Sequence, residues 1–243
     1  MRLKPADDRG LARAGLKDPM RIGIIGAGNV GRALAVRFAA AGHEVLLSNS
    51  RGPDSLADEV ASIEGNVGAG TVAAAARFGD VVAVAIPPGA IRKLPPAPFA
   101  GKIVVDATNY FPEFDGHIPE LAGDETTTSE VLASLLPGAT VVKAFNAIYF
   151  KRLLAESRPD LPADERLAIP VAGDDATAKQ TVLDLIDEIG FTGVDAGTLA
   201  ESRRQQPGSP VLLAFAESRR QGTTLTAPSL RALLDTSSEG GQS

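Results

Sequence analysis

The sequence contains no cysteine and no tryptophan, and only two of its 243 residues are histidine, His43 and His117. Without cysteine there is no disulfide, no thiolate metal ligand and no cysteine nucleophile. Two histidines are also too few for a mechanism or a metal site that needs several, so we expect no metal. Basic residues are outnumbered by acidic ones, 24 to 30, which leaves a net charge of −6. Nucleic acids and anionic membranes bind concentrated positive charge, so neither is an expected partner.

Long apolar runs are missing as well. No stretch approaches the roughly 18 apolar residues of a membrane-spanning helix, and residues 1–20 lack the apolar core of a signal peptide. We therefore expect a soluble, cytoplasmic protein. Residues 1–20 alternate basic and acidic groups, which predicts a flexible extension. A thin stripe of Leu3, Leu11 and Leu16 leaves an amphipathic membrane anchor as the alternative.

From Arg21 onward, short apolar runs alternate with segments of helical periodicity. Hydrophobic residues make up 44% of the chain and charged residues 22%, as in an average globular domain. The expected strands lie at 22–25, 44–47, 66–71, 81–86, 102–107, 141–145, 169–172 and 193–196. The expected helices lie at 29–41, 54–62 (capped by Asp54), 71–77, 129–136 (capped by Ser129), 182–189 and 229–234.

This alternation is typical of parallel crossover units, with helices on both faces of an open sheet. The predicted fold is therefore α/β, a Rossmann-type, doubly wound, mostly parallel sheet with a small C-terminal α/β extension. We place the first domain at residues 21–150. Residues 151–243 form a small α/β region that completes the substrate cleft and ends in a flexible tail.

A glycine-rich segment, Gly26-Ala27-Gly28-Asn29-Val30-Gly31, joins the first expected strand to the first expected helix. In that context G-x-G-x-x-G predicts a dinucleotide-binding loop. Gly26 permits the tight turn, Gly28 lets the pyrophosphate approach the backbone, and Gly31 lets the helix pack on the strand. The N-terminus of the helix offers free N–H groups to the phosphates.

The end of the second expected strand discriminates between NAD and NADP. An acidic residue there binds the ribose 2′-hydroxyl of NAD, whereas the 2′-phosphate of NADP needs room and positive charge. This chain has Ser48-Asn49-Ser50-Arg51, with no acid. Arg51 can pair with a phosphate, and the hydroxyl and amide groups can donate hydrogen bonds to it. The segment thus predicts NADP(H), and makes residues 21–150 an NADP-binding domain.

Ligands of open α/β sheets lie beyond the carboxyl ends of the strands. Further candidate cofactor-binding residues therefore follow the later strands: Ile86, Pro87, Pro88, Asn109, Ala144, Phe145 and Asn146. The amide of Asn146 either orients the nicotinamide, which makes it our candidate catalytic residue, or caps the next helix. His43 lies at the far end of the sheet, so we expect it to be structural.

Together these residues resemble the NADPH-dependent deazaflavin (coenzyme F420) reductase family. The likeness runs through residues 21–204 and is most specific at 170–175 (PVAGDD), 195–199 (DAGTL) and Ser202-Arg203. Lys143-Ala144-Phe145-Asn146 is also similar to the cytosolic domain of the six-transmembrane metalloreductases, which pass electrons from NADPH through a flavin. The family's archaeal members carry a histidine where this chain has Asn146, and an aromatic residue where it has Pro88.

The resemblance implies a nicotinamide near Ile86, Pro87 and 144–146, with a deazaflavin ring stacked on it for direct hydride transfer. Our leading hypothesis is an NADP(H)-dependent oxidoreductase that transfers a hydride between NADPH and a small-molecule acceptor, F420 or FMN/FAD. By analogy with fold neighbours we expect a homodimer. One alternative is an imine or pyrroline carboxylate-type reductase, which needs a long helical dimerisation domain after the sheet. Another is a non-catalytic NADP(H) sensor.

Overall fold

One continuous sheet of eight strands organises the described part of the chain, which is residues 18–121, 123 and 125–239 of the computed structural model. The strand order is β3-β2-β1-β4-β5-β6-β7-β8. The strands are β1 Arg21–Ile25, β2 Glu44–Ser48, β3 Val67–Gly70, β4 Val81–Val84, β5 Ile103–Asp106, β6 Thr140–Lys143, β7 Ala168–Gly173 and β8 Thr192–Asp195. The order reverses between β1 and β4, which places a ligand-binding crevice beyond their carboxyl ends.

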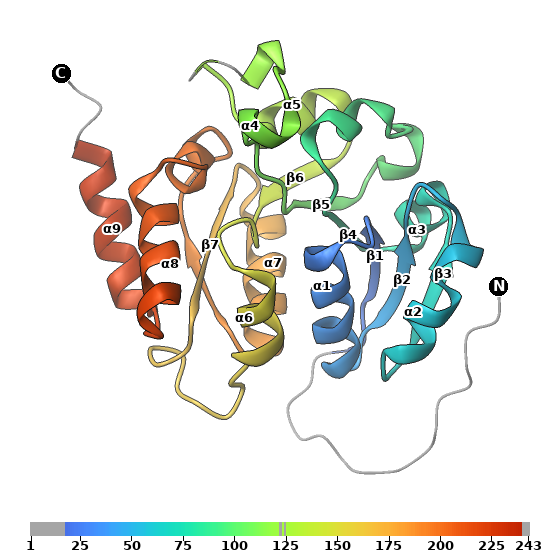
Figure 1. Cartoon of the computed structure of the whole chain (residues 1–243), viewed down its shortest axis with the longest axis horizontal. Coiled ribbons are helices and arrows are strands. Elements are labelled where there is room, and N and C mark those ends of the chain that lie inside the picture. The colour runs from blue at the N-terminus through green and yellow to red at the C-terminus, as the bar shows by residue number, and fades with distance from the viewer. Residues whose placement is uncertain (1–17, 122, 124, 240–243) are drawn as a thin grey trace.

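Helices cover both faces of this sheet (Figure 1). The α-helices are α1 Asn29–Ala40, α2 Ala57–Ser62, α3 Val72–Phe78, α4 Pro112–Asp115, α5 Thr128–Leu135, α6 Phe150–Ala155, α7 Ala176–Glu188, α8 Pro210–Gln221 and α9 Ala227–Glu239. Short 3₁₀ helices are η1 Pro53–Leu56, η2 Pro88–Lys93, η3 Ala97–Phe99, η4 Pro119–Leu121 and η5 Ala200–Gln205. No helix among the described residues is long and apolar enough to cross a membrane.

Alternate residues of the central strands supply two separate cores. Val81 and Ala83 of β4 belong to the core beneath α1 and α6, while Val82 and Val84 belong to the core beneath α3 and α5. All four are buried, as expected for a parallel strand covered on both faces. The sheet is thereby packed between two layers of helices, which fix the positions of the carboxyl ends of its strands.

Most of the predicted elements are present, with a few corrections. The helix predicted to start at Ser129 is capped instead by Thr127, whose hydroxyl accepts from the Glu130 N–H in a reciprocal capping box. The predicted cap at Asp54 is also wrong, because Asp54 lies inside η1 and makes no capping bond. β7 runs antiparallel to β6 and pairs with it over two residue pairs only.

The two regions predicted from the sequence meet at this short pairing. The boundary at residue 150 falls between β6 and α6, and the sheet continues across it. Residues 1–17 of the predicted N-terminal extension and the last residues of the predicted tail, 240–243, lie outside the described residues. Helices α6 and α8 were not predicted.

Candidate active site

The glycine loop connects β1 directly to α1. The N–H of Gly26 donates to the carbonyl of Ser48 at 2.9 Å, which ties the loop to the end of β2. Gly26 has a φ of +109°, and a Cβ built on it would lie 2.3 Å from the carbonyl oxygen of Ala85. A Cβ on Gly31 would lie 1.8 Å from the carbonyl oxygen of Gly26. The protein itself therefore requires glycine at both positions, for the turn and for helix packing.

Gly28 is different, because no protein atom requires it to be glycine. Its φ is −79°, and a Cβ built there would meet nothing within 4 Å. Gly28 is the N-cap of α1, and no side chain caps that helix end. The structure thus has open space and free backbone N–H groups where a dinucleotide-binding loop holds its pyrophosphate, and the residues fit that group.

A cavity of about 480 Å³ opens beside this loop, between the ends of β1, β2 and β4. It is lined by many of the predicted cofactor-binding residues: Gly26, Ala27, Gly28, Asn49, Ser50, Arg51, Ile86 and Pro87. Val72, Ala90, Leu94 and Pro95 give it an apolar side suited to a planar ring. We call it the coenzyme cavity.

Lys93 is a second cation of the coenzyme cavity, and the sequence analysis missed it. It ends η2, which follows β4, whereas Arg51 follows β2. The only available signal was the proximity of Arg92-Lys93 to the end of a strand, and sequence spacing could not place it near Arg51. Among the described residues, neither the guanidinium of Arg51 nor the ammonium group of Lys93 has a hydrogen-bond or ion-pair partner.

Two of the predicted phosphate-binding side chains make hydrogen bonds within the protein. Ser48 is fully buried, and its hydroxyl donates to the carbonyl of Ile24 at 2.9 Å, so it does not face the cavity. The amide of Asn49 donates to Ser55 Oγ, and its oxygen accepts from the N–H of Arg51 at 2.9 Å. Both side chains therefore shape the loop that presents Ser50 and Arg51.

A second cavity of about 320 Å³ continues from the first. The two share Gly28, Ala85, Ile86 and Pro87 in their linings. The second is also lined by Asn29, Val30, Pro88, Ala107, Thr108, Asn109, Phe111, Phe114, Asp115 and Asn146. We call it the acceptor cavity, and it brings together the ends of β1, β4, β5 and β6 as predicted.

Ala144 and Phe145 do not line either cavity, contrary to the prediction. Both are fully buried, and the ring of Phe145 packs edge-to-face on Phe38 with centroids 6.2 Å apart. Phe145 has a φ of +64°, the only positive value among the described residues other than glycine. This left-handed conformation is unfavourable for a bulky residue, and burial of the ring offsets its cost. The turn it makes sends Phe145 into the core and Asn146 toward the cavity.

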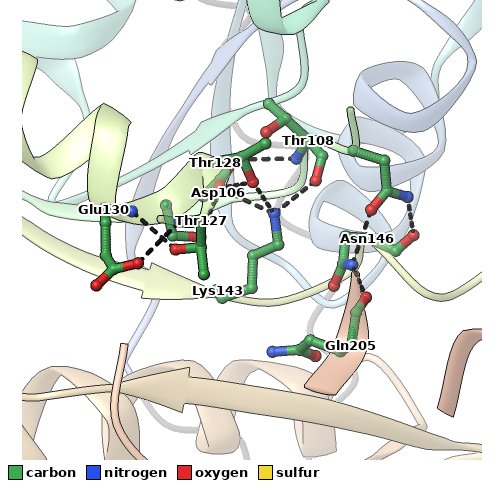
Figure 2. A network of polar contacts seen from close by, with 10 residues as sticks. Asp106, Thr108, Thr127, Thr128, Glu130, Lys143, Asn146 and Gln205 are labelled. Atoms are coloured by element: carbon green, nitrogen blue, oxygen red, sulfur yellow. Dashed lines mark hydrogen bonds and ion pairs between the residues drawn. The ribbon is translucent and has the colours of Figure 1, made fainter. Parts of the chain in front are cut away.

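Asn146 is 7% exposed and joins three loops. The side-chain nitrogen Nδ2 of Asn146 donates to Asn109 Oδ1 at 3.0 Å and to the backbone carbonyl of Gln205 at 2.6 Å (Figure 2). The backbone carbonyl of Asn146 accepts from Asn109 Nδ2 at 2.7 Å. It does not cap the next helix, whose N-cap is Tyr149. Asn146 Oδ1 is buried without a protein partner among the described residues, and is thus an acceptor left for a ligand or water.

A buried ion pair lies behind these loops. Lys143 Nζ is 2.9 Å from Asp106 Oδ2, and both side chains are fully buried. Lys143 also donates to the carbonyl of Thr108 and to the hydroxyl of Thr128, and Asp106 accepts from Ser129 Oγ (Figure 2). Burial raises the pKa of Asp106, but the Lys143 charge and the hydrogen bonds outweigh it and hold that pKa below its ordinary value. Burial lowers the pKa of Lys143, against the pull of Asp106.

Neither histidine lines the coenzyme cavity or the acceptor cavity. His43 is buried, with Nδ1 accepting from the N–H of Met20 and Nε2 3.0 Å from Glu188 Oε2, so it is structural as predicted. His117 is exposed in the loop after α4. Nor do the described residues hold any cluster of metal-binding side chains.

An open glycine loop, a doubly wound sheet and a cleft at the carboxyl ends of its strands define a Rossmann-type, dinucleotide-binding fold. Residues 21–110 match the family model of coenzyme F420-dependent NADP oxidoreductases. The hypothetical protein SMa0349 of Sinorhizobium meliloti is 36% identical, with a TM-score of 0.68 over 79% of this chain and 92% of its own. Over residues 21–110 the chain is therefore similar to coenzyme F420-dependent NADP oxidoreductases.

Other proteins are similar to this chain as well. An Arthrobacter sp. FB24 structure assigned as an F420-dependent NADP reductase is 27% identical, with a TM-score of 0.67 over 84% of this chain and 96% of its own. Metalloreductase STEAP3 of Rattus norvegicus is 32% identical over 193 residues, 77% of this chain. The chain spans only 36% of the length of that metalloreductase. An Aspergillus terreus reductive aminase, at 19% identity and a TM-score of 0.56, shares the fold.

Proposed function

We propose that this chain binds NADP(H) in the coenzyme cavity and transfers a hydride between it and a flavin-like ring, F420 or FMN/FAD, in the acceptor cavity. The observation that carries the proposal is that the two cavities are neighbours, with Gly28, Ile86 and Pro87 in the linings of both. A dinucleotide that follows this surface has its phosphates at the start of α1 and its nicotinamide end at the acceptor cavity.

Binding of the coenzyme rests on the backbone and on two cations. The pyrophosphate is favoured by the free N–H groups and positive dipole end of α1, next to the open space at Gly28. The loop at Ser50 and Arg51 contains no carboxylate that would repel a 2′-phosphate. Arg51 and Lys93 supply positive charge to the same cavity.

The acceptor cavity supplies orientation. When bound, NADPH gives up a hydride to the oxidised ring, which also takes a proton from water, and NADP⁺ is left. The chain's task is to hold the two reactants face to face, which lowers the barrier by proximity. Asn146, fixed by Asn109 and Gln205, keeps one amide oxygen free to orient a polar group at this junction.

Gly28→Val tests coenzyme binding without disturbing the fold. The protein leaves room here, since a Cβ built on Gly28 meets nothing within 4 Å, whereas a valine side chain takes up space that the pyrophosphate needs. We expect NADPH affinity to fall by about 100-fold or more, equivalent to ~2.7 kcal/mol, in calorimetric titration, with an unchanged melting temperature. Gly89→Val is the matched control, because Gly89 also faces open space and lines neither cavity.

The activity is tested by mixing the wild-type protein with NADPH and either F420 or FMN and recording absorbance. We expect NADPH oxidation with at least one of the two rings. An absence of NADPH binding would overturn the whole proposal. Tight NADPH binding with no oxidation by either ring would overturn hydride transfer and leave the sensor hypothesis.

A further inference from the structure

Phe114 is the most exposed large apolar side chain of the described residues, with 84% of its surface accessible. It lies in α4 and lines the acceptor cavity together with Phe111. The two rings pack edge-to-face, 6.2 Å apart at an angle of 70°. An exposed apolar ring loses the free energy that its burial would give, and this one lines a cavity beside a second aromatic ring, which favours a ligand surface.

Hydrogen bonds within residues 110–118 fix the loop that carries Phe114. The hydroxyl of Tyr110 donates to the carbonyl of Gly116 at 2.9 Å and accepts from the N–H of Ile118 at 3.1 Å, so it closes the segment 110–118 on itself. Asp115 Oδ2 accepts from the N–H of Phe111 at 2.8 Å and fixes the turn at its start. A loop closed by its own hydrogen bonds therefore holds the aromatic pair at the cavity, and Phe114 stays outside the core.

The remaining lining of the acceptor cavity is apolar or uncharged. Opposite α4 lie residues of the glycine loop and the segment Ile86–Pro88. The sole titratable side chain that lines the cavity is Asp115, and one of its oxygens is occupied by Phe111. A ketone or imine that accepts a hydride needs a proton donor at its heteroatom, and the one carboxyl group that lines this cavity already holds the turn at Phe111. A planar ring that delocalises the added charge needs none.

We infer that Phe111 and Phe114 form an aromatic wall that binds the outer face of the acceptor's planar ring system, with Phe114 as the residue that determines acceptor affinity. This inference rests on the proposed function and names its second substrate class as an extended heteroaromatic ring. The nicotinamide then lies on the side of Ile86 and Pro87, and the acceptor lies between it and the aromatic wall. Stacking and burial of one phenylalanine ring account for the affinity.

The test compares Phe114→Ala, Phe114→Trp and Leu213→Ala with the wild type. Leu213 is a matched control, because it is 62% exposed but lies on α8 and lines neither cavity. Fluorescence quenching measures binding of oxidised F420 or FMN to the protein loaded with NADP⁺, where no turnover occurs. We expect Phe114→Ala to weaken ring binding about 10-fold and to raise the acceptor KM equally, with NADPH affinity unchanged. Phe114→Trp restores binding, and Leu213→Ala changes neither.

Each alternative outcome has a distinct signature. Unchanged ring binding in Phe114→Ala, with normal NADPH binding, would overturn the aromatic wall and leave the proposed function intact. A wild-type protein that binds no NADPH would overturn the proposed function first. A change in oligomeric state of Phe114→Ala in sedimentation, without a change in ring binding, would make Phe114 a contact between copies of the chain and overturn the inference.

Discussion

At the scale of single residues, coenzyme selection depends on where positive charge faces the cavity. Arg51 was predicted from the missing carboxylate at the end of β2, and the structure places it in the lining with its loop held by Asn49. Lys93 reaches the same cavity from η2. We expect these two cations, from separate segments, to favour the additional 2′-phosphate, beyond the pyrophosphate that all such coenzymes share.

Arg51→Ala should therefore weaken NADPH binding at least ~10-fold more than NADH binding, since a charge-assisted hydrogen bond contributes about 1.5–3 kcal/mol. Lys93→Ala should likewise weaken NADPH binding more than NADH binding. Arg92→Ala is the control, because Arg92 pairs with Glu120 and lines neither cavity. Titrations of each variant with both coenzymes measure this. Equal losses for NADPH and NADH would show that the charges do not bind the 2′-phosphate.

At the scale of elements, the buried pair of Asp106 and Lys143 joins the ends of β5 and β6 to the start of α5. Besides the pair itself, Lys143 holds the carbonyl of Thr108, and Asp106 holds the N–H of Thr108 at 2.9 Å. Thr108 lines the acceptor cavity, whereas Asp106 and Lys143 do not, so the pair positions Thr108 from behind the cavity. Two charges removed from water are stable only while each keeps its partner.

Lys143→Met should lower the free energy of unfolding by about 3–5 kcal/mol, because it leaves the Asp106 carboxylate buried and uncompensated. Adding Asp106→Asn to this variant removes the orphaned charge and should recover part of the loss. Urea denaturation of the wild type and the single and double variants measures both effects. A single variant as stable as the wild type would show that the pair contributes nothing to the fold.

The elements that sequence patterns could predict are those with a local cause. β1, the glycine loop and α1 follow from apolar periodicity and glycine spacing, and they are present as predicted. The turn at Phe145 could not be predicted, because its left-handed backbone is tolerated only through the packing of its ring on Phe38. The roles of Ser48 and Ser129 could not be predicted either. Their hydroxyls donate to the carbonyl of Ile24 and to Asp106, groups that lie more than twenty residues away in the sequence. Phe114 carried no periodic signal at all.

At the scale of the whole molecule, elements of the two predicted regions pack together. Helices α1 and α6 are in contact, and the turn between α1 and β2 contacts the end of α7 through His43 and Glu188. His43 also accepts from the N–H of Met20 and packs edge-on against Phe38, 5.9 Å away. The expected homodimer stays a prediction, since no second copy is present to test it.

Burial of His43 should make the stability of the whole molecule depend on pH near neutrality. Burial lowers the pKa of His43 more than Glu188 raises it, so the folded protein binds a proton less readily than the unfolded chain, where the pKa is about 6.5. Above that value both states are neutral and the histidine has no effect. As the pH falls below it, the unfolded chain gains a proton that the folded state resists, and stability falls by at most ~1.4 kcal/mol per pH unit. Urea denaturation between pH 7.5 and 5.5 should show this slope in the wild type and in His117→Gln, but not in His43→Gln. The same slope in both variants would show that His43 is not its source.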